Sequence, residues 1–176
     1  MVLEFERQDA GAPPHLANRV IYGQTRKVLE GKLTKGGRLT LWAAPNRRGG
    51  YCMALDGPSH PGEVGCLWRG QAAPVAVGIE ARAMTRDGDI TRGPALVWGT
   101  VTVDKAETIE LHYQDGAVES QPLTWVSKPI DAAFFLFEID RTHWQRGHQH
   151  ERLIVRDGGG GELRSELLRQ GRPRPR

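Results

Sequence analysis

The sequence predicts an all-β protein, an antiparallel β-sandwich of nine or ten short strands. Short apolar stretches with period-two alternation recur along the chain, as in strands with one buried face. Turn residues separate most of these stretches, and the 176 residues include 22 glycines and 11 prolines. No long helical pattern dominates, which favours an antiparallel sandwich or barrel, and of these two we expect the sandwich.

Composition divides the chain into three parts. Residues 1–18 are expected to form an extended leader, because paired prolines and small residues oppose both helix and strand. Residues 19–168 carry the strand-like stretches and are expected to form a single β-sandwich domain, a size that fits one core. Residues 169–176 contain four arginines and no acid, and are expected to be a disordered basic tail.

The first elements follow from β-prone side chains and alternation. Residues 19–24 include Val20, Ile21 and Tyr22 and are expected to form a strand, with a helix over residues 19–30 as the alternative. Residues 39–43 alternate aliphatic side chains with Thr40 and Trp42, which predicts a strand with one aliphatic face. A turn, the second arm of a hairpin and a loop rich in Gly, Pro and His are expected at 45–50, 51–55 and 57–65.

The later part of the chain continues this pattern. Residues 133–139 are too apolar for a strand with one wet face, and we expect this strand to be the most buried one. Tyr22-Gly23 followed by residues 39–41 resembles Trp98-Gly99 followed by residues 109–111, which suggests two similar halves. An immunoglobulin-like sandwich is the other arrangement that we expect. Further strands are expected at 75–84, 96–103, 108–113, 117–126, 151–156 and 162–168.

The two cysteines, Cys52 and Cys66, are predicted to form a disulfide. They enclose 13 residues, and a hairpin arm and the segment after it can bring the two sulfur atoms together. Closing a loop of this size stabilises a fold by roughly 3 kcal/mol. Two buried reduced thiols are the alternative. A zinc site is not expected, because only His60 lies nearby as a further ligand.

The one histidine cluster gives the only metal-site candidates. His148 and His150 would point to the same face of a strand, a geometry that suits two metal ligands, and His143 lies close in the sequence. Solvated loop histidines that titrate near their ordinary pKa are the simpler interpretation. We therefore expect no metal and no cofactor, with His148 and His150 as weak metal-ligand candidates.

Catalytic motifs are not found in the sequence. The glycines after Asp157 lack the lysine and hydroxyl residue of a phosphate-binding loop, and are expected to form a hairpin tip. No Gly-x-Ser-x-Gly element is present, and no acid–base pair stands out. The sequence thus predicts a protein that is not an enzyme, and we assign no catalytic residue.

Five tryptophans stand at positions 42, 68, 98, 125 and 144. Tryptophans in β-sandwiches usually fill the core or cap its ends, and we expect this role rather than a ligand groove. Trp144 is the exception, because its neighbours are polar. We expect it to be a surface contact residue.

The positive charge of the chain lies in its tail. The formal net charge is +3, and without the four arginines of residues 169–176 it is −1. A basic face for nucleic acid is therefore not expected. Binding of an acidic partner through the tail is an alternative role, and it would be weak and strongly dependent on salt.

Location follows from two negative observations. No stretch approaches the roughly 20 apolar residues of a membrane-spanning helix, so no transmembrane segment is expected. Residues 1–7 lack the order of a secretory signal. The expected location is cytoplasmic for the chain as it stands, and extracytoplasmic if an N-terminal signal or anchor has been removed.

Two blocks of sequence resemble uncharacterised extracytoplasmic β-rich proteins of actinobacteria. The first runs from Gly37 through Cys52 and is completed by Gly65-Cys66, and the second includes residues 99–101, 109–111, 134–137 and 156–158. The resemblance implies a β-rich domain behind a signal peptide or membrane anchor, with no assigned activity. This chain differs in lacking such an anchor.

These observations favour a non-catalytic extracytoplasmic binding or interaction module whose partner is a protein or a cell-envelope component. A metal-dependent enzyme that uses His143, His148 and His150 is one alternative, and an adaptor that binds through the basic tail is another. The ligand, the biological process and the oligomeric state are not encoded in any recognisable motif.

Overall fold

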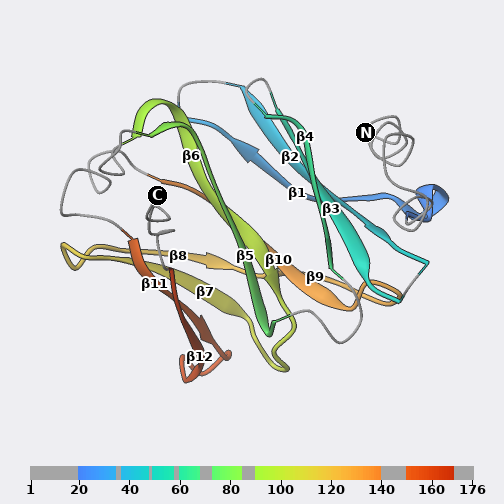
Figure 1. Cartoon of the computed structure of the whole chain (residues 1–176). Helices are drawn as coiled ribbons and strands as arrows, with labels where there is room; N and C mark the ends of the chain where they lie inside the picture. The colour runs from blue at the N-terminus through green and yellow to red at the C-terminus, as the bar shows by residue number, and fades with distance from the viewer. Residues whose placement is uncertain are drawn as a thin grey trace, which may run out of the picture.

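The computed structural model describes residues 20–34, 37–47, 49–57, 60–67, 73–84, 90–139 and 150–168. Within these residues the chain is all-β, with twelve strands and one short 3-10 helix (Figure 1). The elements are η1 (Tyr22–Gln24), β1 (Arg26–Lys32), β2 (Arg38–Pro45), β3 (Tyr51–Gly57), β4 (His60–Leu67), β5 (Val75–Met84), β6 (Ile90–Val101), β7 (Thr108–Tyr113), β8 (Val118–Pro122), β9 (Thr124–Val126), β10 (Ala132–Glu138), β11 (His150–Arg156) and β12 (Glu162–Leu167).

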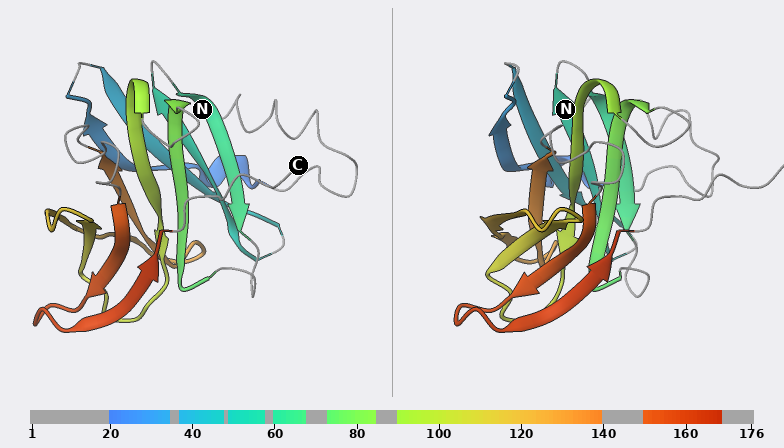
Figure 2. Two further views of the ribbon diagram at one scale, coloured as in Figure 1. Left: turned by 60° about the vertical axis from the view of Figure 1, so that its left-hand side comes forward. Right: turned by 90° about the vertical axis from the view of Figure 1, so that its left-hand side faces the viewer.

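The strands form three antiparallel sheets of four strands each. The first sheet has the order β1-β2-β3-β4, the central sheet β5-β6-β10-β9 and the third sheet β12-β11-β7-β8. Both views in Figure 2 show the red strands β11 and β12 at the lower end of the molecule, away from the blue strands β1 and β2. The expected antiparallel all-β class is confirmed.

The central sheet packs against a neighbouring sheet on each of its faces. One core joins Trp98 and Phe134 of the central sheet to Leu41 of the first sheet. The other core joins Phe135 of the central sheet to Leu153 of the third sheet. Successive side chains of a strand point to opposite faces, so neighbouring residues of β10 enter different cores.

The fold is sandwich-like, as expected, but the described residues form two large cores, one on each face of the central sheet, in place of one core between two layers. The prediction of nine or ten strands is wrong, because the described residues alone form twelve. Strand 133–139 is buried as expected, since it faces a core on both sides. It is not more buried than every other strand, because β3 and β10 each bury five of their seven residues.

Three local predictions are corrected by the structure. Of residues 19–24, the described residues 20–24 do not form a strand: Val20 makes an isolated bridge to Asn46, and the first strand of the described residues is β1, which places Val28 in a core. The helix alternative is also wrong beyond the single turn of η1. Residues 57–65 are not simply a loop, because β4 pairs with β3 through most of that stretch.

The predicted strand 117–126 is divided between two sheets. β8 pairs with β7 in the third sheet, whereas β9 pairs with β10 in the central sheet. The division falls at Leu123, whose main-chain N–H donates to the carbonyl of Glu107 at 2.8 Å. The leader and the tail lie outside the described residues.

Candidate apolar binding site

Cys52 and Cys66 form a disulfide, as predicted, and neither thiol is free. The two residues are direct cross-strand partners in β3 and β4, with their Cα atoms 4.0 Å apart. Both contribute to a small cluster of buried residues that does not include the inward-facing residues of β3. The disulfide therefore lies on the outer face of the first sheet.

The cross-strand pairs on either side of the disulfide face inward. Met53 pairs with Gly65, and Tyr51 pairs with Leu67. Because side chains alternate along a strand, these four residues lie on the face opposite the disulfide. Tyr51 and Met53 are buried there, and Leu67 packs against the same core.

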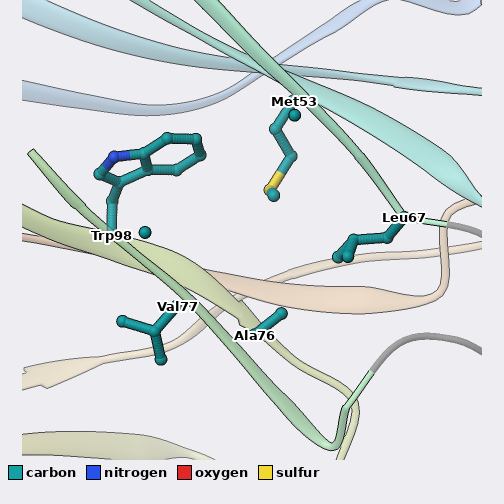
Figure 3. Close-up of a pocket in the computed structure, with 7 residues that line it drawn as sticks. Met53, Leu67, Ala76, Val77 and Trp98 are labelled. Atoms are coloured by element: carbon teal, nitrogen blue, oxygen red, sulfur yellow. The ribbon is translucent and has the colours of Figure 1, made fainter. Parts of the chain in front are cut away.

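Three of these inward-facing residues form one wall of a pocket between the first and central sheets. Met53, Gly65 and Leu67 line it from the first sheet, and the residues that line it from the central sheet are Ala76, Val77 and Gly78 of β5 and Trp98 of β6. The pocket has a volume of about 280 Å³. Figure 3 shows Met53 and Trp98 entering the same space from opposite sheets. In the described residues β4 and β5 are edge strands, so the pocket lies at the seam between two sheet edges.

The space exists because several of the lining side chains are small. A Cβ atom added to Gly65 would meet no other atom within 4 Å. Gly78 is different: its cross-strand partner is Trp98, and an added Cβ would lie 3.0 Å from Cε2 of the indole ring. The indole therefore lies over Gly78 and is held in place by the strand beneath it.

A buried hydrogen bond joins the two sheets beside the pocket. The Tyr51 hydroxyl donates to Oγ1 of Thr100 at 2.7 Å, and Thr100 is 1% exposed. The cross-strand partners of these two residues are Leu67 and Ala76, which both line the pocket. The Tyr51 ring also contacts Phe134 edge-on, with centroids 5.8 Å apart. Burial raises the pKa of Tyr51, while its hydrogen bond to Thr100 acts in the opposite direction.

The pocket is lined almost entirely by apolar groups. None of its seven lining residues carries a titratable side chain. The one polar side-chain atom, Nε1 of Trp98, is buried and has no hydrogen-bond partner. Figure 3 shows this nitrogen on the side of the indole away from Met53 and Leu67. The described lining is therefore suited to hold an apolar group, and none of the residues in it supplies an acid or a base.

A charged cluster on the third sheet is internally paired. Oε1 of Glu110 accepts from Nε of Arg156 at 2.7 Å, and its Oε2 lies 2.8 Å from Nε2 of His112. The hydrogen bond from Arg156 is the main cause that lowers the pKa of Glu110. Both carboxylate oxygens of Glu110 have a partner, and the contact with Arg156 is a structural ion pair between β7 and β11.

The predicted histidine site falls largely outside the described residues. His143, His148 and Trp144 are not among them, and only the main chain of His150 is described, at the start of β11 opposite Tyr113. Among the side chains that the structure describes, no group of three or more His, Cys, Asp or Glu could hold a metal ion. Within the same part of the chain, no helix is long and apolar enough to cross a membrane.

The glycine run after Asp157 forms a hairpin tip, as predicted. It joins β11 to β12, and Oδ1 of Asp157 accepts from the main-chain N–H groups of Gly159 and Gly161 at 3.0 and 2.7 Å. The Asp157 side chain thus stabilises the turn that follows it through hydrogen bonds within the loop.

Sequence reasoning did not identify the pocket. Trp98 was expected to be a core residue, and at 7% exposed it is one, but it also lines the pocket. The available signal was the presence of small residues inside strands: Gly65 and Ala76 leave space, and Gly78 admits the indole of Trp98. Comparison with protein-family models, curated proteins and solved structures gives no match for the chain.

Proposed function

We propose that this chain is a non-catalytic extracytoplasmic binding module whose ligand occupies the pocket between the first and central sheets. The observation that carries the proposal is the 280 Å³ apolar pocket at the seam between β4 and β5. Ligand sites are typically concave, mostly apolar and preformed, and this pocket lies just below their usual size range of roughly 300–1,000 Å³.

Preorganised walls support a binding role. The disulfide joins edge strand β4 to β3 between the two pairs that supply Met53, Gly65 and Leu67. The bond between Tyr51 and Thr100 joins the two sheets beside the same residues. A pocket held from both sides loses less conformational entropy when a ligand binds, which favours affinity.

The disulfide also supports an extracytoplasmic location. Structural disulfides persist in oxidising compartments and are rare in the reducing cytosol. The bond between Cys52 and Cys66 closes the short loop that connects β3 to the edge strand β4. A disulfide that joins two neighbouring strands in this way has a structural role, because it holds β4 against β3.

The proposal is tested with a neutral fluorescent probe, N-phenyl-1-naphthylamine, titrated into the folded protein. We expect one saturable site in the wild type and loss of that site in Gly65→Leu, because the new side chain enters the pocket. The matched control is Gly23→Leu, since Gly23 lies outside the pocket and an added Cβ there also meets nothing within 4 Å. Circular dichroism and thermal unfolding check that both variants fold. Absence of saturable binding, or binding that Gly65→Leu leaves intact, contradicts the proposal.

A further inference from the structure

We infer that the pocket takes an uncharged, flat aromatic group of about two fused rings. This inference rests on the proposed function and adds the chemical class of the ligand. Its evidence is the volume of the pocket, the chemistry of its lining and the two side chains, Trp98 and Met53, that enter it from opposite sheets.

The volume sets the size of the group. A cavity of about 150 Å³ lined by apolar side chains holds one benzene molecule. The pocket here, at about 280 Å³, is nearly twice as large. It therefore suits two fused six-membered rings or a saturated group with a similar number of carbons.

The lining excludes a charge on the group that enters. The seven described residues that line the pocket provide no counter-ion, and their only polar side-chain atom, Nε1 of Trp98, faces away from Met53 and Leu67 (Figure 3). Moving an unpaired ion into such a site costs at least several kcal/mol. A cation over the single indole would regain only about 0.5–2 kcal/mol. The loss outweighs the gain, so a neutral group is favoured.

The walls favour an aromatic group over a saturated one. Trp98 provides a rigid aromatic surface, because its indole lies against Gly78. Met53 faces it with a flexible thioether, and sulfur contacts aromatic rings favourably. Aromatic pairs contribute about 0.5–1.5 kcal/mol beyond the apolar area that they bury. A flat aromatic ring between Trp98 and Met53 makes both an aromatic–aromatic and a sulfur–aromatic contact, whereas a saturated ring makes only ordinary van der Waals contacts there.

Two pairs of matched probes test the inference on the wild-type protein. The first pair is 2-naphthol and decahydro-2-naphthol, which share one carbon skeleton. The second pair is 1-methylnaphthalene and N-methylquinolinium, which share one shape and differ in charge. Binding is followed by the methyl resonance of Met53, one of three methionines in the chain, assigned with Met53→Leu.

We expect 2-naphthol to bind about three- to tenfold more tightly than its saturated analogue. We expect 1-methylnaphthalene to bind at least tenfold more tightly than N-methylquinolinium. The preference for the aromatic member of the first pair should disappear in Trp98→Leu and remain in Trp125→Leu, because Trp125 is 44% exposed and lies outside the pocket. Equal or reversed affinities within either wild-type pair overturn this inference alone. If none of the four probes shifts Met53, the proposed function itself fails.

Discussion

Cys52 and Cys66 face each other across β3 and β4 on the outer side of the first sheet, directly between two residue pairs that line a pocket on its inner side. One covalent bond thus fixes the register of an edge strand and the shape of a pocket wall. The described part of β4 pairs with no strand other than β3.

Removal of the disulfide should destabilise the fold and weaken binding in the pocket. We expect Cys52→Ala/Cys66→Ala to lose about 3 kcal/mol of unfolding free energy, the value for a closed loop of this length. Urea unfolding measures the loss, and titration with N-phenyl-1-naphthylamine measures the binding. Dithiothreitol should have the same effects on the wild type and no further effect on the double variant. Unchanged stability after complete reduction would show that β4 is held by other contacts.

Tyr51 and Thr100 should be energetically coupled. Tyr51→Phe leaves the buried Thr100 hydroxyl without its donor, and we expect a loss of about 1–2 kcal/mol. Thr100→Val leaves the tyrosine hydroxyl unpaired, with a loss of similar size. The double variant should lose clearly less than the two single losses together, because no buried polar group then lacks a partner. Strict additivity in urea unfolding would argue against the bond.

Gly78 and Gly65 should respond differently to the same substitution. In Gly78→Ala the new Cβ lies 3.0 Å from the indole of Trp98, which must shift, and we expect a loss of about 1–3 kcal/mol. In Gly65→Ala the new Cβ meets nothing, and stability should be unchanged or slightly raised. Thermal unfolding of the two variants makes the comparison. Equal destabilisation by both would mean that the indole does not lie over Gly78.

The ion pair between Glu110 and Arg156 should make stability depend on pH. The pKa of Glu110 is lowered in the folded state from its ordinary value of 4.5, chiefly by its hydrogen bond with Arg156. The stabilisation is therefore complete above about pH 4.5 and is lost as the pH falls through the lower, folded-state pKa. We expect the difference in unfolding free energy between wild type and Glu110→Gln to shrink as the pH falls below about 4.5. Its size at pH 7 should be about 1 kcal/mol.

Glu30→Gln provides the control for that measurement. The Glu30 carboxylate also pairs with a cation, Lys27, but 34% of its side chain is exposed, against 18% for Glu110. Solvent screens the exposed pair more strongly, so its pH-dependent effect should be smaller. A larger effect for Glu30 than for Glu110 would contradict the assignment of the third-sheet pair as the stronger one.

Much of the local structure was predictable from residue patterns. The strand at Thr108–Tyr113 follows from strict alternation of buried and half-buried side chains, and the disulfide follows from two cysteines in adjacent strands. The hairpin tip after Asp157 follows from its glycines. These features depend on residues close in the sequence, where side-chain period and turn chemistry act directly.

The errors arose where distant segments compete. β4 contains His60, Pro61 and Gly62, residues that indicate a loop, yet it pairs with β3 beside the disulfide. Residues 117–126 were predicted as one strand because nothing local shows that β8 and β9 join different sheets. Pairing of a strand with its neighbours outweighs such local preferences, which are weak.

The sequence alone determined that this chain is an antiparallel β protein with one disulfide, because side-chain alternation, turns and paired cysteines are properties of neighbouring residues. Only the tertiary structure decided that the central sheet is covered on both faces and that Met53 and Trp98 meet across a pocket. Alternation shows that a strand has two faces, but it does not show which sheet each face meets. A pocket is space left between two sheets, and that space depends on how the sheets pack.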